Sequence, residues 1–201
     1  MNMVRESLII FAKNPVAGNV KTRLAATIGD KEALSVYEWL LDCTFHATEN
    51  LNCRKSVYFD TMPSKNNVHS LAPYPSLLQQ GENLGEKMKN AFLHEFEHAD
   101  KVVIIGSDCA DLEEKHITAS FKILSSHDAV IGPAVDGGYY LLGLSSFIPS
   151  LFENIAWSTK QVLTQTQHKL DHAGLSWTML EKLTDIDTVE DLRTRSENNH
   201  V

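Results

Sequence analysis

A loop with three basic side chains around a glycine is the first part of the sequence that could do chemistry. It spans residues 13–23 and contains Lys13, Lys21 and Arg23, with Gly18 between them. Cationic side chains bind phosphate oxygens through charge-assisted hydrogen bonds, and glycine lets backbone approach a ligand closely. The pattern favours a site for a di- or triphosphate, and the plainer alternative is a solvated basic loop.

Two familiar phosphate-binding motifs do not match this loop. Lys21 and Thr22 resemble the end of a P-loop, but Val20 stands where that motif requires the glycine before its lysine. The G-x-G-x-x-G fingerprint of dinucleotide-binding proteins does not occur in the sequence. A phosphate site in this loop would therefore be neither a P-loop nor a dinucleotide-binding fingerprint.

Carboxylates follow an apolar run in the middle of the chain and recur near its C-terminal end. Asp108 and Asp111 come shortly after residues 101–105, and Asp185 and Asp187 are two positions apart. Carboxylate oxygens are suitable ligands for Mg²⁺ or Mn²⁺. Helix capping is the alternative role, which we expect for Asp111 and leave open for Asp108 and for one of the later pair.

An acid, two glycines and two tyrosines are adjacent at residues 136–140. The sequence predicts a turn between two strands here. A tight hairpin accounts for the acid and the glycines. It does not account for two aromatic side chains at the same edge, so we interpret the turn as part of a binding site as well.

His94 and His98 bracket a match to the H-E-x-x-H signature of zinc proteases. At 100° per residue, however, both histidines point roughly opposite Phe92, which lies on the apolar face of the predicted helix. No third zinc ligand follows at a recognised spacing. We therefore reject zinc proteolysis and interpret these residues, like His168 and His172, as ordinary partners of a helix C-terminus.

The elements that must position these residues follow from apolar patterning. Continuous apolar runs at residues 8–11 and 102–105 suit central strands that are buried on both faces. Other segments have apolar residues at helical or alternating spacing. Together the patterns predict helices near 30–50, 84–96, 114–124, 159–173 and 189–195, and strands near 8–11, 56–59, 77–80, 102–105, 129–133 and 138–144, with a short strand before the last helix.

Alternating strands and helices predict a three-layer α/β/α fold around a mostly parallel central sheet. Residues 61–75, with three prolines, are the one long irregular loop that we expect. In an open α/β sheet, ligands bind beyond the carboxyl ends of the strands. The basic loop and Asp108 each follow a central strand, so we expect them to face the same crevice.

Composition restricts the class of protein. The 201 residues include 18 Lys and Arg and 26 Asp and Glu, for a net charge of −8, and 43% are hydrophobic. This predicts one domain over residues 1–201 that does not bind nucleic acid, because nonspecific binding to nucleic acid needs many cations. No apolar segment approaches the ~20 residues of a membrane span, and the N-terminus lacks a signal-peptide pattern, so we expect a cytoplasmic protein. Buried, reduced thiols are expected for Cys43, Cys53 and Cys109.

Several motifs in the same order resemble one family over nearly the whole chain. They resemble the bacterial glycosyltransferase-like family called radical-SAM/selenodomain-associated transferase 1. This resemblance implies the nucleotide-diphospho-sugar transferase fold, of the glycosyltransferase A type. The segments that carry the resemblance are Phe11-Ala12-Lys13, Val20-Lys21-Thr22-Arg23-Leu24, Gln80-Gly81, Leu84-Gly85-Glu86-Lys87-Met88, Gly106-Ser107-Asp108, Gly132-Pro133, Asp136-Gly137-Gly138-Tyr139-Tyr140, Trp157-Ser158-Thr159 and Asp185-Ile186-Asp187-Thr188.

The resemblance also implies roles for individual residues. It assigns the nucleotide to the basic loop and to a Gln-Gly pair, the metal to two aspartates, and the sugar or acceptor to the 136–139 turn. Asp108 and Asp136 are the expected catalytic residues. The full expected set is Lys13, Gly18, Lys21, Thr22, Arg23, Gln80 and Gly81 for the nucleotide, Asp108 and Asp187 for the metal, and Asp136, Gly137, Gly138 and Tyr139 for the sugar or acceptor.

We therefore expect a transferase that depends on Mg²⁺ or Mn²⁺ and moves a glycosyl unit from a nucleotide sugar to a small-molecule acceptor. The alternative reaction is nucleotidyl transfer from an NTP to a phosphorylated small molecule. A catalytically silent nucleotide-binding module is the alternative from another class. The base, the sugar, the acceptor, the oligomeric state and the choice between Asp185 and Asp187 as the late metal ligand stay open at this point.

Overall fold

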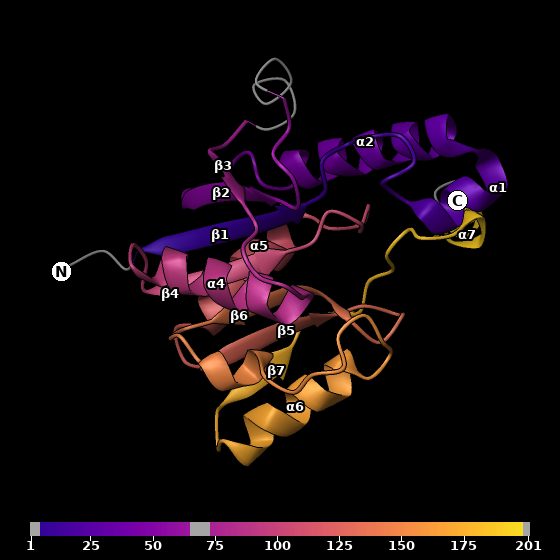
Figure 1. Cartoon of the computed structure of the whole chain (residues 1–201). Helices are drawn as coiled ribbons and strands as arrows, with labels where there is room; N and C mark the ends of the chain where they lie inside the picture. Colours follow the sequence, from indigo (N-terminus) through magenta and orange to yellow (C-terminus); the bar gives the residue numbers. More distant parts are fainter. Residues whose placement is uncertain (1–4, 65–72, 199–201) are drawn as a thin grey trace.

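The computed structural model of the chain describes residues 5–64 and 73–198 (Figure 1). Part of the predicted irregular loop at 61–75 thus lies outside the described residues. Strands and helices alternate along most of the chain. The strands are β1 (Glu6–Ala12), β2 (Arg54–Phe59), β3 (Ser76–Leu78), β4 (Lys101–Ile105), β5 (Ala129–Pro133), β6 (Tyr139–Leu144) and β7 (Trp177–Met179); the helices are α1 (Thr22–Ile28), α2 (Asp30–His46), α4 (Leu84–Phe96), α5 (Glu114–Ile123), the 3₁₀ turn η1 (Pro149–Phe152), α6 (Val162–His172) and α7 (Val189–Asn198).

In the described residues the strands form one sheet, in the order β3-β2-β1-β4-β6-β5-β7. Strand β6 pairs antiparallel with both of its neighbours, and every other pairing is parallel. All strands except β6 therefore end at the same edge of the sheet. This arrangement confirms the predicted α/β fold with a mostly parallel sheet and places the loops after β1, β4 and β5 together.

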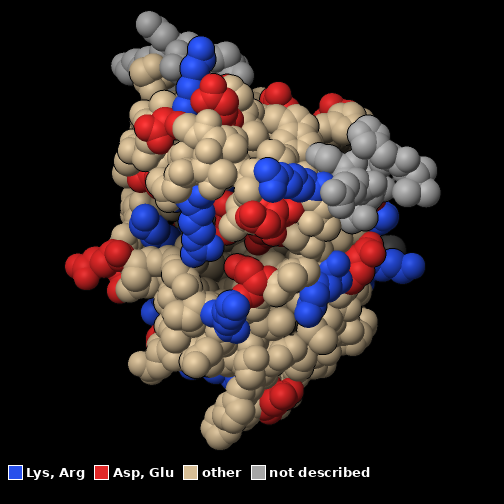
Figure 2. All heavy atoms as spheres, turned by 90° about the vertical axis from the view of Figure 1, so that its right-hand side faces the viewer, with Lys and Arg blue, Asp and Glu red and all other residues tan. Residues whose placement is uncertain are grey.

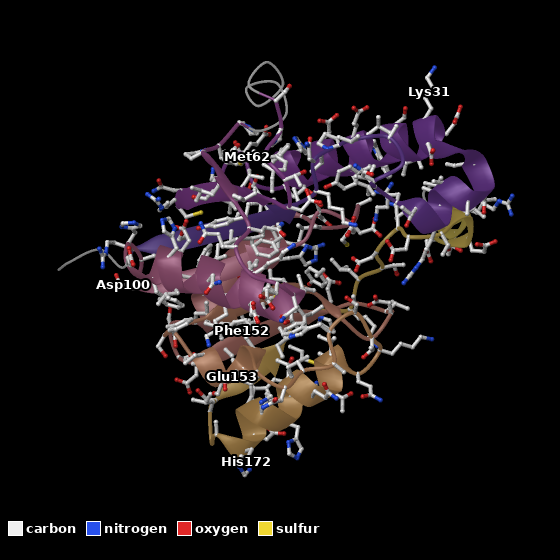
Figure 3. The ribbon with its side chains drawn as sticks, viewed as in Figure 1. Lys31, Met62, Asp100, Phe152, Glu153 and His172 are labelled. Carbon is white, nitrogen blue, oxygen red and sulfur yellow. The ribbon has the colours of Figure 1, made fainter. Side chains whose placement is uncertain are left out.

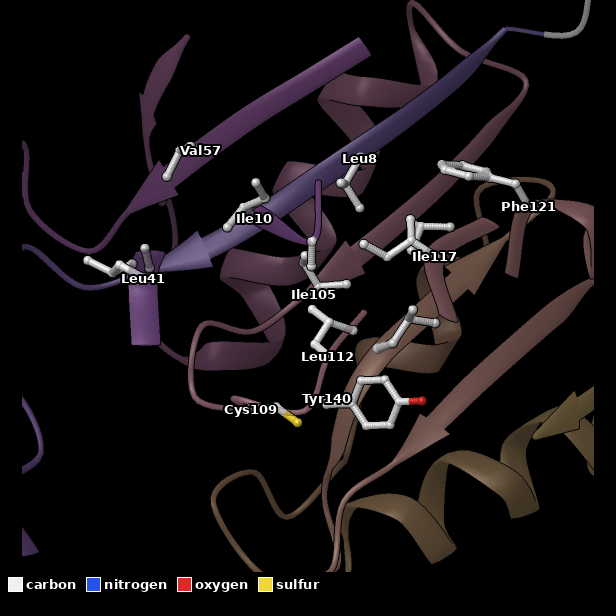
Figure 4. Packing of buried hydrophobic residues seen from close by; sticks show 14 of the residues in the cluster. Leu8, Ile10, Leu41, Val57, Ile105, Cys109, Leu112, Ile117, Phe121 and Tyr140 are labelled. Carbon is white, nitrogen blue, oxygen red and sulfur yellow. The ribbon is translucent and has the colours of Figure 1, made fainter. Parts of the chain in front are cut away.

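Alternate residues of the central strands enter two separate cores, because successive side chains of a strand point to opposite faces. Leu8 and Ile10 pack with α2 and α5 on one face of the sheet, and Figure 4 shows this cluster. Ile9 and Ile104 pack with α4, η1 and α6 on the other face. The fully apolar runs predicted for β1 and β4 are thus explained by helices covering both faces.

A third, smaller core fixes the C-terminal helix. Ile186 and Leu40 are fully buried, and Leu192 and Trp39 pack against them. This cluster holds α7 beside α1 and α2, at the edge of the sheet where most strands end (Figure 1).

The structure differs from the sequence prediction in a few local features. The predicted helix at 30–50 ends at His46, and a separate short helix, α1, precedes it. Gly29 divides the two helices with a φ of 92°, a conformation that favours glycine. The 3₁₀ turn η1 was not predicted. Only Cys109 is fully buried; Cys43 and Cys53 are half-buried, which corrects the expectation for these two thiols.

No helix in the described part of the chain is both long enough and apolar enough to span a bilayer.

Candidate functional site

The candidate site lies where the parallel strands end. Figure 2 shows this face with acidic side chains gathered near its middle and Lys and Arg side chains around them. The acids come from three distant segments: the loop after β4, the β5–β6 turn and the segment before α7. The fold thus brings together Asp108, Asp136, Asp185 and Asp187, as the sequence predicts for residues at this edge.

Lys21 lies at the centre of this acidic cluster. Its Nζ is 2.6 Å from Asp108 Oδ1 and 3.1 Å from Asp187 Oδ1, and only 3% of its side chain is exposed. Burial acts to lower the pKa of Lys21, but the charges and hydrogen bonds of the two aspartates outweigh it and raise the pKa. The sequence predicts a lysine that is presented to phosphate, whereas the structure shows one enclosed by carboxylates.

The other basic residues of the loop are open to solvent. Arg23 has 75% of its side chain exposed and lies 3.5 Å from Asp187, measured from Nη1 to Oδ2. Lys13, Gly18 and Thr22 are also exposed. These residues are accessible to an incoming anion.

Two side chains that the sequence analysis missed hold the basic loop in place. The Tyr37 hydroxyl accepts a hydrogen bond from the Lys13 backbone N–H at 2.7 Å and lies 3.2 Å from Ser107 Oγ. Asp60 Oδ1 accepts the backbone N–H of Asn14 at 2.8 Å. These bonds tie the loop to α2, to the end of β2 and to the loop that carries Asp108. No motif points to Tyr37 or Asp60, because each acts on backbone that is distant in sequence.

A backbone hydrogen bond sets the register of the late aspartates. The Ile186 N–H donates to the Asp108 carbonyl oxygen at 2.9 Å. Because Ile186 is buried in the third core, its neighbours Asp185 and Asp187 are directed toward the opposite side of the segment. The predicted pair at positions i and i+2 therefore reaches the site with Asp108.

Neither late aspartate is needed to cap α7. Thr188 Oγ1 accepts the Asp191 N–H of the first turn at 3.3 Å, and the Asp191 carboxylate accepts the N–H groups of Thr188 at 2.8 Å and Asp187 at 3.1 Å. The predicted capping role of Asp111 is wrong as well. Glu113 is the residue before α5, and Asp111 Oδ1 instead accepts a hydrogen bond from Arg195 Nε at 2.9 Å.

The β5–β6 turn is a tight hairpin, which accounts for the acid and the glycines as the sequence analysis expects. Asp136 is exposed, and its Oδ1 accepts the Gly138 N–H at 2.9 Å. Gly137 has a φ of 93°, and a Cβ at this position would clash with the backbone of Lys160. A tight approach of the 157–160 loop thus explains Gly137 on structural grounds, while Asp136 lies near enough to the aspartate cluster to influence it.

The two tyrosines of this turn pack into the fold. The Tyr139 hydroxyl is directed at Met88 Sδ, 3.9 Å away, and its ring belongs to the core beneath α4. The Tyr140 hydroxyl donates to the Glu181 carbonyl oxygen at 3.1 Å on the other face. The structure therefore directs the Tyr139 hydroxyl into the core and not toward the aspartates.

The Gln-Gly pair lies at the outer side of the sheet. Gln80 is exposed, and Gly81 has a φ of 136°, where a Cβ would clash with Glu86 at the start of α4. The preceding residue, Gln79, links two strands. Its Nε2 donates to the Tyr58 carbonyl oxygen on β2 at 2.8 Å and to the Ala12 carbonyl oxygen on β1 at 3.2 Å. The exposed Gln80 side chain is accessible for the predicted contact with a base.

The H-E-x-x-H match has a structural explanation. Glu95 is fully buried and accepts hydrogen bonds from Ser7 Oγ at 2.7 Å and Arg54 Nε at 2.9 Å. His94 is half exposed with Nδ1 2.8 Å from the Tyr58 hydroxyl, so it does not simply point to water as predicted. The Glu95 carboxylate is thus hydrogen-bonded inside the core and is not accessible to a water molecule.

A second pair of histidines lies away from the site. The rings of His168 and His172 are stacked 6.3 Å apart on α6, and Figure 3 shows His172 at the outer end of that helix.

The aspartate cluster carries more negative charge than its basic residues balance. Burial first, and then the charges of Asp108, Asp136 and Asp187, raise the pKa of Asp185 to about 7, although Lys21 acts in the opposite direction. Asp108, Asp136, Asp187 and the partly protonated Asp185 thus share two nearby cations, Lys21 and Arg23, so the cluster retains an excess of negative charge. A bound divalent cation would balance this excess.

The donor set fits Mg²⁺ or Mn²⁺ better than a soft metal, because it consists of carboxylate oxygens. Within the described residues there is no group of three or more acidic, histidine or cysteine side chains arranged to hold a metal alone. Mg²⁺ commonly takes one or two carboxylates together with phosphate oxygens and water. Asp108 and Asp187, which already meet at one cation, are the two carboxylates that could serve.

The fold is similar to that of known nucleotide-dependent transferases. A solved structure of a candidate nucleotide-diphospho-sugar transferase from Desulfovibrio desulfuricans is 31% identical, with a TM-score of 0.92, over 98% of this chain and 88% of that one. An inositol-1-phosphate CTP transferase from T. maritima, at 14% identity and a TM-score of 0.59, covers 97% of this chain and 94% of that one. Rv0371c from Mycobacterium tuberculosis, solved with manganese, is 14% identical, with a TM-score of 0.56, over 97% of this chain and 99% of that one. The last two likenesses show the fold alone.

Fold and sequence together thus define a protein of the nucleotide-diphospho-sugar transferase superfamily. The family model DUF2064, described as "Uncharacterized protein conserved in bacteria", matches residues 45–159. The chain belongs to this family. No curated protein sequence matches the chain.

Proposed function

We propose that this protein is a transferase that uses a nucleotide-activated donor and a divalent cation, and that it transfers a glycosyl unit from a nucleotide sugar to a small-molecule acceptor. One observation carries the proposal: Asp108 and Asp187, 79 positions apart in the sequence, both contact the ammonium of Lys21 in the basic loop. The whole of residues 1–201 acts in this proposal as one domain. The likeness to a candidate nucleotide-diphospho-sugar transferase supports a sugar donor.

The residues of the chain divide the work between binding and charge neutralisation. Arg23 and Lys13, exposed beside the acidic cluster, bind the diphosphate through charge-assisted hydrogen bonds. Asp108 and Asp187 hold Mg²⁺ or Mn²⁺, which when bound neutralises charge that develops on the phosphate oxygens as the donor is cleaved. Gln80 contacts the base, and Asp136, in the turn next to the cluster, faces the acceptor.

Nucleotidyl transfer is the second candidate reaction. It is favoured by neighbours of the same fold, which include the CTP transferase from T. maritima and a CMP:2-keto-3-deoxy-manno-octonic acid synthetase complexed with CTP. Product analysis distinguishes the reactions, because glycosyl transfer releases a nucleoside diphosphate and nucleotidyl transfer releases pyrophosphate. Binding of nucleotide without either product would instead support a silent nucleotide-binding module.

The metal role of the two aspartates gives a direct test. Asp108→Asn and Asp187→Asn should each lower metal-dependent turnover on the order of 10²–10⁴-fold, because each removes a metal anchor in the transition state. Asp111→Asn is the matched control: it lies on the same loop, and its amide oxygen can still accept the Arg195 hydrogen bond that holds α7, so it should change turnover by less than about fivefold. Retention of a full metal response in Asp108→Asn would contradict the proposal.

A further inference from the structure

Lys21 differs from the other basic residues near the site in being enclosed. Its side chain is 3% exposed, whereas 75% of the Arg23 side chain is exposed. The ammonium is 2.6 Å from Asp108 Oδ1 and 3.1 Å from Asp187 Oδ1. Lys21 therefore pairs with the two carboxylates and is not open to an incoming phosphate.

Lys21 contacts both carboxylates that the proposed function assigns to the metal. A Mg²⁺ ion binds carboxylate oxygens at about 2.0–2.1 Å. An ammonium group within hydrogen-bonding distance of the same oxygens would be very close to that ion, and the two positive charges would repel each other strongly. Lys21 and a divalent ion therefore compete for these two carboxylates.

We propose that Lys21 is a built-in counter-ion of Asp108 and Asp187, that a divalent cation must displace it from these carboxylates, and that it then turns to the phosphates of the donor. This inference rests on the proposed function, because it assumes that the metal binds at these aspartates. It adds a positioning role for Lys21 that differs from a permanent phosphate contact.

The local structure permits such a displacement. Lys21 directly precedes α1 and has the left-handed backbone conformation, with a φ of 47°. Its neighbours Val20 and Leu24 are fully buried and anchor the backbone. The flexible four-carbon stem of lysine can then move its charged group while the backbone stays in place. Arg23 remains near Asp187 and can stay paired with it.

The exchange links metal binding to nucleotide binding. A metal ion that arrives alone must compete with Lys21, so it binds weakly. A donor phosphate that accepts the Lys21 ammonium removes this competition, so metal and nucleotide favour each other's binding. A lysine that served only as a phosphate ligand would affect the binding of metal alone no more than the exposed Lys13 does.

The test is the affinity for Mn²⁺ without nucleotide, measured by electron paramagnetic resonance on the full chain. Lys21→Met keeps the length of the side chain and removes its charge. We expect it to bind Mn²⁺ about tenfold more tightly than wild type, a change of about 1.4 kcal/mol. Lys13→Met is the matched control, since it removes the same charge from the same loop at an exposed position and should change the affinity much less.

Asp108→Asn separates failure of this inference from failure of the proposed function. If Asp108→Asn abolishes Mn²⁺ binding while Lys21→Met binds no more tightly than wild type, the counter-ion role is overturned and the metal site stands. If Asp108→Asn leaves Mn²⁺ binding unchanged, the metal is not held at this residue and both proposals fail. An equal gain in Lys13→Met would also overturn the role of Lys21, because it would reflect only the general loss of charge.

A measurement on wild-type protein covers the case in which Lys21→Met does not fold. Acetylation of lysines by N-hydroxysuccinimide acetate is followed by mass spectrometry, with the exposed Lys13 as internal reference. Saturating Mn²⁺ without nucleotide should raise the labelling rate of Lys21 severalfold relative to Lys13, because the displaced amine becomes accessible. An unchanged ratio would overturn the proposal.

Discussion

A buried carboxylate at the edge of the sheet opposite the candidate site shows what a structural acid looks like in this protein. Glu95 is fully buried and accepts hydrogen bonds from three side chains. Ser7 lies near the start of β1, Arg54 is the first residue of β2, and Tyr58 lies further along β2. Burial acts to raise the pKa of Glu95, but these three hydrogen bonds and the charge of Arg54 outweigh it and lower the pKa. The aspartates of the site, by contrast, carry more negative charge than their partners balance.

We expect Glu95→Gln to lower the free energy of unfolding by about 2–3 kcal/mol at pH 7, because hydrogen bonds to a charged group are lost. The folded-state pKa lies below the unfolded value of about 4.3, so the stability from Glu95 is complete above that pH and is lost as the pH falls through the folded value. The penalty of the variant should therefore shrink at acid pH. Urea unfolding between pH 3 and pH 8 measures it.

Glu97→Gln is the matched control for this residue, because Glu97 is exposed at the end of the same helix. It should change the unfolding free energy by less than about 0.5 kcal/mol. A Glu95→Gln protein that is as stable as the control at neutral pH would refute the structural role of Glu95 and reopen the interpretation of the H-E-x-x-H match.

At the scale of elements, α7 holds two parts of the candidate site together. Arg195 on α7 bonds Asp111 at 2.9 Å and the Ala110 carbonyl oxygen at 3.2 Å, and its guanidinium is 5.0 Å from the centre of the Trp39 ring. Asp187 immediately precedes α7. Docking of this helix therefore fixes the distance between the Asp108 loop and Asp187.

Arg195→Ala should lower stability by about 1–2 kcal/mol, since it removes a partly buried ion pair and a cation–π contact. Hydrogen exchange should speed up at the Asp187 and Thr188 amides, which are bonded to Asp191, because α7 undocks more often. Hydrogen-exchange mass spectrometry measures this effect. Arg193→Ala, at an exposed position of α7, is the control, and equal exchange in both variants would show that Arg195 does not hold the helix.

The elements themselves illustrate which features local sequence can predict. The apolar runs of β1 and β4 correctly predict central strands, because helices cover both faces of the sheet. The division between α1 and α2 at Gly29 was not predicted, since the apolar spacing alone does not reveal a positive φ. The antiparallel direction of β6 follows from the short hairpin after β5, which the Asp136-Gly137-Gly138 turn did indicate.

At the scale of the whole molecule, ligand binding at one edge of the sheet should stabilise the entire fold. A ligand at 100 times its dissociation constant contributes about 2.7 kcal/mol, which for a chain of this size corresponds to a rise in Tm of about 5–10 °C. We expect this rise for the correct nucleotide or nucleotide sugar with Mn²⁺ or Mg²⁺, and a much smaller rise for either component alone. A thermal-shift screen with and without metal measures it.

The control for that screen is Asp108→Asn, which should respond to nucleotide in the same way with or without metal. A wild-type protein that is stabilised equally by a nucleotide in the presence of a chelator would contradict the linked binding of metal and nucleotide. The identity of the nucleotide that gives the largest shift would also distinguish uridine, guanosine and cytidine donors.

The sequence alone determined the α/β class, because the alternation of buried strands and amphipathic helices is a local pattern. It also placed Lys21, Asp108 and Asp187 at one edge of the sheet, since each follows a strand or loop whose direction the fold class sets. Only the tertiary structure decided which charges are in contact. Lys21 lies between the aspartates and not in an open loop, Asp111 pairs with Arg195, and Tyr139 points into the core. The physical reason is that ion pairs and burial depend on distances between residues far apart in the chain, which the packing of three cores fixes and local spacing does not.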